Sequence, residues 1–142
     1  MILPDVNLLL YAVDADAPRH APARAWLEAV LSGTEEVGFA WAVILGFVRI
    51  STNARAFEKP LDGSQAFAYV EEWLERPVSL PLAPGPGHVD RMRELLEPLG
   101  VAGNLTSDAH LAALAIEHGA ELCSSDTDFA RFKDLRWRDP LS

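Results

Sequence analysis

Four aspartates stand where proteins built from alternating strands and helices place their sites. Asp5 ends a short apolar opening segment, and Asp108 lies at the start of an amphipathic helical pattern. Asp126 and Asp128 follow the apolar run 120–123. In α/β proteins, ligands bind beside the carboxyl ends of parallel strands, and carboxylate oxygens suit hard cations such as Mg²⁺ and Mn²⁺. The four acids therefore predict a metal cage, if the fold brings them to one edge of a sheet.

Each acid also has a simpler structural explanation. An acid that caps a helix or lies in its first turn stabilises it by roughly 0.5–2 kcal/mol. Taken alone, Asp108 needs no other role, and Asp126 would cap a short helix in the same way. Asp128 would then be a surface acid, and Asp5 the polar end of a strand. Only the combination of the four favours a metal site.

The elements that must position these acids alternate along the chain. Apolar runs predict strands at 1–4, 37–40, 78–82, 120–124 and 135–137, and helical spacing predicts helices at 8–13, 18–33, 41–50, 62–76, 89–99, 108–118 and 126–132. Short strands that alternate with helices form parallel βαβ units. We therefore expect a three-layer α/β/α sandwich with a short, mainly parallel sheet of four or five strands. Pro81 cannot donate to a strand ladder and predicts that its strand lies at or near the edge.

Length and composition indicate one ordinary globular unit. The 142 residues are 49% hydrophobic and 23% charged, which predicts a single domain over residues 1–142. No apolar run approaches the roughly 20 residues needed to span a membrane, and no secretory signal is visible. Cys123 cannot form an internal disulfide, because it is the one cysteine. We expect it to be a core residue of a reduced, cytoplasmic protein.

The formal net charge of −9 limits the class of partner. It disfavours a protein that coats nucleic acid through a broad basic surface. It does not exclude an enzyme that meets phosphate through a bound cation, because the cation inverts the local field. A basic partner segment would also suit this charge, although a solvated acidic surface explains it equally simply.

Three segments, in this order and spacing, carry a family resemblance: 3–11, 106–115 and 122–129. They are similar to PIN-domain proteins and, more narrowly, to the VapC-type ribonuclease toxins of type II toxin–antitoxin systems, and the similarity extends over essentially the whole chain. It implies a PIN-like fold and a Mg²⁺-dependent endoribonuclease that hydrolyses RNA phosphodiester bonds, with Mn²⁺ able to substitute. It also implies a cognate antitoxin protein and a homodimer, for which the helices at 18–33 and 62–76 offer surfaces.

The resemblance implies a role for each acid. Asp5, Asp108 and Asp126 match the family's catalytic carboxylates, and Asp128 would join them in holding the metal. Mg²⁺ keeps several waters and needs one or two direct carboxylates. Asp5 and Asp108 would provide these contacts, whereas Asp126 and Asp128 would hold metal-bound water or a second ion. A metal so held polarises a phosphodiester and lowers the pKa of the attacking water.

Three further residues would support this site. Asn7 would brace Asp5, and Ser124 stands where the family often has a threonine. Arg49 would contact RNA phosphate, and a solvated surface position is an equal alternative for it.

One position departs from the family pattern. The family usually carries a glutamate in the helix after the second strand, but the segment 43–49 has Gly46 at that place. Either Asp128 restores the number of acids, or a water fills the gap. The departure leaves a second function open, a PIN-fold module that binds RNA or protein without cutting. A phosphatase or a DNA nuclease on a similar sheet is a third possibility.

The four histidines show no zinc-like spacing with each other or with Cys123. We expect surface or helix-end positions for His20, His88, His110 and His118.

Overall fold

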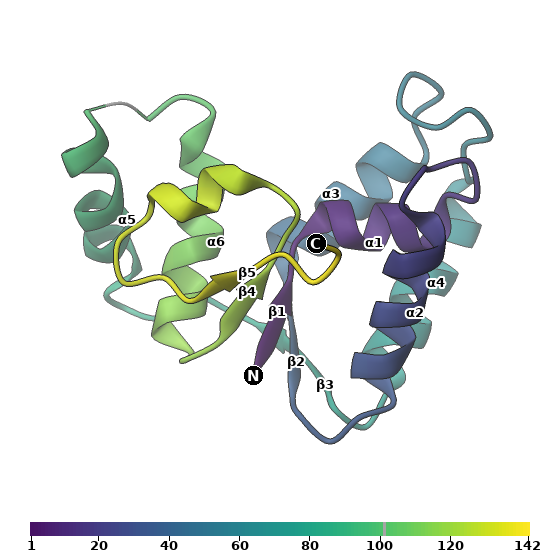
Figure 1. Cartoon of the computed structure of the whole chain (residues 1–142), viewed down its shortest axis with the longest axis horizontal. Helices are drawn as coiled ribbons and strands as arrows, with labels where there is room; N and C mark the ends of the chain where they lie inside the picture. The colour runs from purple at the N-terminus through teal and green to yellow at the C-terminus, as the bar shows by residue number, and fades with distance from the viewer. Residues whose placement is uncertain (101) are drawn as a thin grey trace.

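Short parallel strands form the centre of the fold (Figure 1). The computed structural model of the protein describes residues 1–100 and 102–142. Within these residues the five strands are β1 (Ile2–Pro4), β2 (Val37–Ala40), β3 (Ser79–Leu82), β4 (Glu121–Cys123) and β5 (Trp137–Arg138). They lie in the order β3-β2-β1-β4-β5, and every neighbouring pair is parallel. The expected parallel sheet is confirmed, and Pro81 lies in an edge strand, as predicted.

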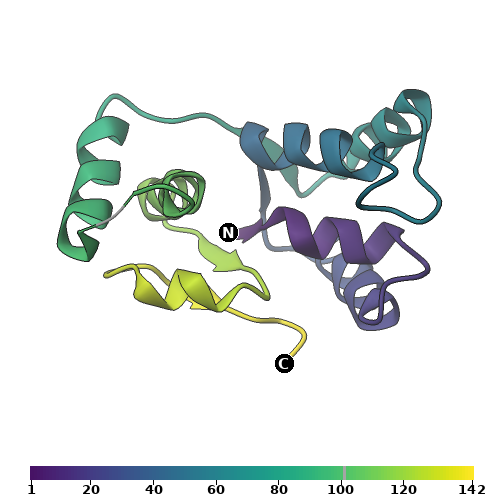
Figure 2. The ribbon, with the colours of Figure 1, turned by 90° about the horizontal axis from the view of Figure 1, so that it is seen from above.

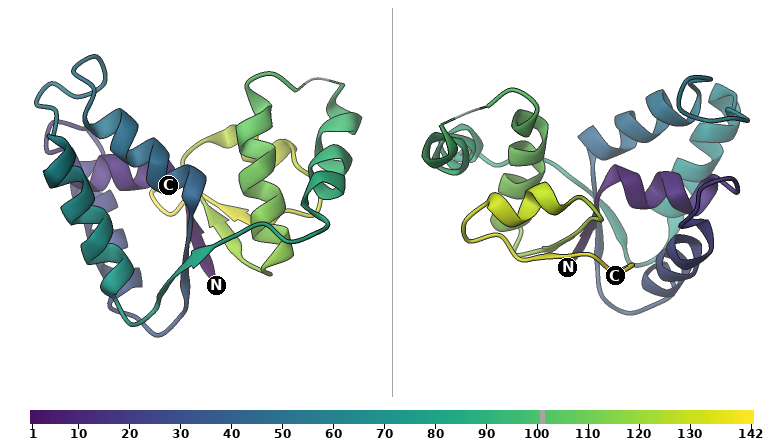
Figure 3. Two further views of the ribbon diagram at one scale, coloured as in Figure 1. Left: turned by 180° about the vertical axis from the view of Figure 1, so that it is seen from behind. Right: turned by 45° about the horizontal axis from the view of Figure 1, so that its top comes forward.

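Helices cover both faces of this sheet. In the described residues the α-helices are α1 (Val6–Val13), α2 (His20–Leu31), α3 (Trp41–Ser51), α4 (Gly63–Glu75), α5 (His88–Leu96) and α6 (Leu105–Glu117), and the 3₁₀ helices are η1 (Glu97–Leu99) and η2 (Thr127–Arg131). The helices α1 to α4 pack together on one side, whereas α5, α6 and η2 lie on the other (Figure 3). The expected three-layer architecture is therefore confirmed.

The chain order explains this division and locates a site. The chain steps from β1 to β2 and on to β3 in one direction. Right-handed crossovers then place α1 to α4 on one face. It returns to β4 on the other side of β1, so α5 and α6 cover the opposite face, with the N-terminus between the two groups (Figure 2). The direction reverses between β1 and β4, and open α/β sheets bind ligands at the carboxyl ends of the strands at such a point.

The core is apolar on both sides of the sheet. Every residue of β1 and β2 is buried, as expected for strands covered on both faces. Trp73 stacks parallel to Phe39 at 6.3 Å and meets the edge of Phe47 at 4.8 Å between ring centroids. Cys123 is fully buried, which confirms it as a core residue, and burial raises the pKa of its thiol to about 12. Among the helices of the described residues, none is both long and apolar enough to cross a membrane.

Several element boundaries differ from those predicted. The helix α6 begins at Leu105, three residues before Asp108, so Asp108 lies in its first turn. The N–H groups of Leu105 and Thr106 donate to the carbonyls of Ala102 and Gly103, and these backbone bonds leave no mark in the sequence. The helix α1 begins at Val6, directly after Asp5, rather than at residue 8. The last strand is also displaced, from 135–137 to Trp137–Arg138.

Candidate metal centre

Asp5 lies at the carboxyl end of β1 and is the N-cap of α1. Its Oδ1 accepts a hydrogen bond of 2.7 Å from the Val6 N–H. Its own N–H donates to the Cys123 carbonyl at 2.9 Å, which ties the end of β1 to the end of β4. Burial raises the pKa of Asp5, because the charged form loses hydration, and the bonds from Ser124 and Val6 only partly oppose this. The local structure thus fixes Asp5 in place.

Ser124 connects three of the predicted site residues. Its fully buried hydroxyl donates to Asp5 Oδ2 at 2.7 Å. The same oxygen accepts from Asn7 Nδ2 at 3.3 Å and from the Asp126 N–H at 3.0 Å. Asn7 is thus bonded to Ser124, which in turn is bonded to Asp5, and its bracing role stays a prediction.

The strand β5 holds the backbone of Ser124. The Ser124 N–H donates to the Arg138 carbonyl at 3.1 Å. Trp137 Nε1 donates to the Ser124 carbonyl at 3.0 Å. Because both backbone groups are bonded, the start of the loop that carries Asp126 has a defined orientation.

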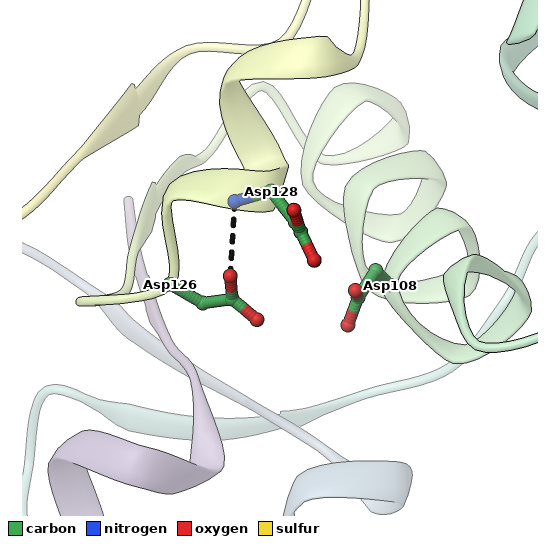
Figure 4. Close-up of side chains that lie close together, drawn as sticks. All are labelled: Asp108, Asp126 and Asp128. Atoms are coloured by element: carbon green, nitrogen blue, oxygen red, sulfur yellow. Dashed lines mark hydrogen bonds between the residues drawn. The ribbon is translucent and has the colours of Figure 1, made fainter.

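Asp108, Asp126 and Asp128 come together into one acidic trio. Each offers a carboxylate oxygen, and these oxygens all lie within 4.8 Å of one another (Figure 4). Asp108 projects from the first turn of α6, whereas Asp126 caps η2 by accepting from the Asp128 N–H at 2.9 Å. Asp126 therefore both caps η2, as the sequence predicted, and belongs to the trio.

The carboxylates repel one another strongly enough to shift proton affinity. The pKa of Asp108 is raised from 3.8 to about 6, first by burial and then by the charges of Asp126, Asp5 and Asp128. Asp5 is near enough to contribute to this field, but it is not one of the three mutually close acids. Its two oxygens are instead bonded to Val6 and Ser124. The predicted four-acid cage is thus a trio with a fourth, anchored carboxylate beside it.

The trio fits a hard divalent cation. Within the described part of the chain, none of the four acids forms an ion pair with a basic side chain. The donors are all carboxylate oxygens, the ligands that Mg²⁺ and Mn²⁺ prefer. A cation at the trio would offset charges that the protein itself leaves unbalanced.

Two other predicted positions lie on α3. Arg49 is exposed in the last turn of α3. Its RNA contact stays a prediction. Gly46 is buried in α3, and a Cβ added there would lie 3.5 Å from Val6 Cγ2. Gly46 therefore lies next to the first residue of α1, close in sequence to Asp5.

Sequence reasoning missed a buried polar chain between α5 and α6. His88 begins α5, which confirms a helix-end position, but its side chain is buried. Its Nε2 lies 2.8 Å from His110 Nδ1, and its Nδ1 lies 3.0 Å from Glu117 Oε1. His110 and Glu117 are seven residues apart on α6, a spacing that places them on one helix face. That spacing was the available signal.

A second missed residue is Arg131 in η2. It lines a pocket of about 530 Å³ together with Asp128 and the start of α6. Arg131 lies three residues after Asp128 in the sequence. This spacing places the two residues on one face only if the segment is a 3₁₀ helix, which the sequence alone did not show.

Comparisons with known proteins show the family to which the chain belongs. The sequence profile of the PIN domain matches residues 2–135. Ribonuclease VapC33 of Mycobacterium tuberculosis is 50% identical over 141 residues, which cover 99% of both chains. The structure of VapBC2 from Rickettsia felis, bound to a DNA fragment from its promoter, superposes with a TM-score of 0.69 at 19% identity, over 97% of this chain and 98% of that one.

A toxin–antitoxin complex from Klebsiella pneumoniae superposes with a TM-score of 0.64 at 17% identity, over 99% of this chain and 98% of that one. Because their sequence identity is so low, these two structures show the fold alone. The match to the sequence profile and the identity to VapC33 show common descent. The chain therefore belongs to the PIN-domain family, in the group that contains the VapC ribonucleases.

Proposed function

We propose that this chain is a metal-dependent endoribonuclease and the toxic component of a type II toxin–antitoxin pair. The trio of Asp108, Asp126 and Asp128 at the reversal point of the sheet carries the proposal. The 50% identity to a protein named as a ribonuclease, over nearly the whole of both chains, supports RNA as the substrate.

The chemistry follows from what each side chain can do. A bound Mg²⁺ or Mn²⁺ would polarise the phosphodiester and lower the pKa of a water. Asp108, Asp126 and Asp128 would hold the cation, and Asp108 must lose its proton to do so. Asp5, fixed by Ser124, would complete the negative field and would lie in direct or near-direct contact with the same cation.

The proposed protein partner is a cognate antitoxin. A solved neighbour of the same fold is a toxin–antitoxin complex. The net charge of −9 and the unpaired acids favour a partner segment with basic side chains. We also propose that the chain acts in the cytoplasm as a homodimer, with α2 and α4 as the candidate surfaces.

A PIN-fold module that binds without cutting remains the competing function, because Gly46 replaces the usual glutamate. The trio favours the enzyme, since three carboxylates lie close together without a fourth acid from α3. Calorimetry with Mn²⁺ separates the two: the enzyme requires binding at millimolar metal or below, and its absence would favour the inert module.

RNA cleavage with purified protein tests the proposal. Wild type, Asp5→Asn and Asp108→Asn are compared on structured and single-stranded RNA with Mg²⁺ and with EDTA. Removing either charge should lower the cleavage rate by on the order of 100-fold or more. Asp90→Asn is the matched control, because Asp90 is also a first-turn acid, in α5, and is exposed. Equal cleavage by wild type and Asp108→Asn would refute the assignment.

A further inference from the structure

A pocket adjoins the acidic trio on the side of α6 and η2. It has a volume of about 530 Å³ and is lined by Ala102, Gly103, Asn104, Leu105, Asp128 and Arg131. Asp128 belongs both to this pocket and to the trio, so the pocket lies next to the candidate metal centre. The volume lies within the range of roughly 300–1,000 Å³ that small-molecule sites occupy. A ligand in the pocket would therefore lie beside Asp128 of the trio.

Arg131 is the cation of this pocket. In a 3₁₀ helix, residues three apart lie on the same face. Asp128 and Arg131 have that spacing in η2, and both line the pocket. The side chain of Arg131 is exposed, and it forms no ion pair with any acid in the described ranges.

Within the described residues, some arginines form ion pairs with acids, whereas others, such as Arg24 and Arg131, form none. Arg76 is bonded to Glu28 at 3.0 Å, and Arg138 is bonded to Glu121 at 2.9 Å. Arg131 instead stays available although the acids of the trio are close by in the fold. A guanidinium that is not engaged by a carboxylate can bind a phosphate through two parallel hydrogen bonds.

The rest of the lining includes a neutral polar side chain, that of Asn104. Asn104 precedes the first turn of α6, and its side chain makes no capping hydrogen bond. Its amide can therefore donate and accept, while Leu105 and Ala102 add apolar surface. One cation, one free amide and apolar surface match a nucleotide, which has a phosphate, hydrogen-bonding edges and a flat base.

We propose that this pocket binds the nucleotide next to the scissile bond of the RNA, with Arg131 on its phosphate. The proposal rests on the ribonuclease function proposed above. Arg131 would give the acidic site an attractive contact with the polyanionic RNA. It also fixes the direction in which the strand leaves the metal centre, past Asp128 toward the start of α6.

RNA binding tests the pocket without requiring cleavage. Fluorescence anisotropy of a labelled single-stranded RNA is measured on the Asp108→Asn background, alone and combined with Arg131→Gln, Arg131→Lys or Lys133→Gln. Lys133 is the matched control, because it is an exposed cation two residues away that does not line the pocket. Each titration is repeated at salt concentrations from about 50 to about 300 mM, a range that includes the physiological value.

Arg131→Gln should weaken binding about fivefold or more and reduce the slope of log K against log salt by about 0.7, the contribution of one phosphate contact in single strands. Arg131→Lys should retain the slope but lose part of the affinity, because it keeps the charge without the planar fork. Lys133→Gln should change neither quantity. Equal affinity and slope for Arg131→Gln and its parent would overturn the proposal, as would an equal loss for Lys133→Gln.

Cleavage assays of the single variants separate this inference from the function on which it rests. If wild type cuts RNA and Arg131→Gln cuts with an unchanged KM, the pocket proposal fails and the ribonuclease stands. If wild type does not cut, the ribonuclease fails, and the anisotropy series still decides whether the pocket binds RNA. Mn²⁺ calorimetry on Arg131→Gln should give the wild-type affinity, which would show that the metal centre is intact.

Discussion

The Ser124 hydroxyl donates a hydrogen bond of 2.7 Å to the Asp5 carboxylate, between residues 119 positions apart in the sequence. The same hydroxyl oxygen accepts from Asn7 and from the Asp126 N–H. One buried oxygen thus sets the position of an acid at the end of β1 relative to the loop that follows β4. This junction, rather than a direct contact between the acids, holds the two halves of the site together.

Removing the Ser124 hydroxyl should damage both stability and activity. Ser124→Ala leaves the Asn7 amide and the Asp126 N–H without their acceptor in a buried setting, which should cost about 1–3 kcal/mol in the free energy of unfolding. RNA cleavage should fall about tenfold or more, a typical loss when a group that orients metal ligands is removed. Urea unfolding and cleavage rates measure the two effects. Ser124→Thr keeps the hydroxyl and should recover most of the activity; no recovery would mean that the hydroxyl is not the determining group.

Divalent metal should stabilise the folded chain. Binding to the trio stabilises by RT ln(1 + [L]/Kd), or about 2.7 kcal/mol at a hundredfold excess over Kd. Thermal unfolding with increasing Mn²⁺ should therefore show a rising Tm that EDTA reverses. Asp108→Asn should abolish the rise and Asp90→Asn should keep it, since Asp108 belongs to the trio and Asp90 does not. A rise of equal size in both variants would place the metal elsewhere.

The stability of the metal-free protein should depend on pH through Asp108. Its carboxyl keeps a proton up to about pH 6 in the folded state but releases it near 3.8 when unfolded. The folded state binds more protons in this window, so the free energy of unfolding should decrease as pH rises from about 4 to 6. Urea unfolding in EDTA at several pH values should show a steeper decrease for wild type than for Asp108→Asn. Parallel curves would contradict the raised pKa.

Protons should also compete with metal at the same carboxyl. Since Asp108 must be ionised to bind a cation, Mn²⁺ affinity should weaken as pH falls below about 6. Calorimetry at pH 5 and pH 7 measures this difference, and an affinity independent of pH would show that Asp108 is not a ligand.

Gly46 should tolerate a side chain. A Cβ at this position would meet Val6 Cγ2 at 3.5 Å, an ordinary van der Waals distance. Because glycine inside a helix costs about 0.8–1 kcal/mol relative to alanine, Gly46→Ala should stabilise the protein by up to that amount. RNA cleavage should stay near the wild-type rate, since no acid is added or removed. A lower Tm would instead show that α1 and α3 pack too closely for a methyl group.

The fold was largely predictable because its signals are local. Fully apolar short strands, such as 37–40, and helices of regular apolar spacing indicate a parallel sheet covered on both faces. Pro81 marked an edge strand for a reason that holds without knowledge of the tertiary structure. The boundary of α6 escaped prediction because backbone carbonyls, rather than a capping side chain, satisfy its first N–H groups.

The site was predictable in its members but not in its arrangement. Asp108, Asp126 and Asp128 were expected to meet, and they do. The separate anchoring of Asp5 depends on the register between β1 and β4, in which Pro4 pairs with Cys123 and brings Ser124 beside Asp5. Register across more than a hundred residues is a tertiary property. The pairing of His88 with His110 was hidden for the same reason, because it depends on how α5 packs on α6.

The pairing of β1 with β4 also sets when the site can exist during synthesis. At roughly 5–20 residues per second, a ribosome that has made Asp5 needs about 6–24 seconds more to reach Ser124. Until then, β1 lacks its neighbour β4, and Asp126 and Asp128 of the trio have not been made. A nascent chain therefore carries Asp5 without the complete trio, and the metal centre can assemble only after the last part of the chain has been made.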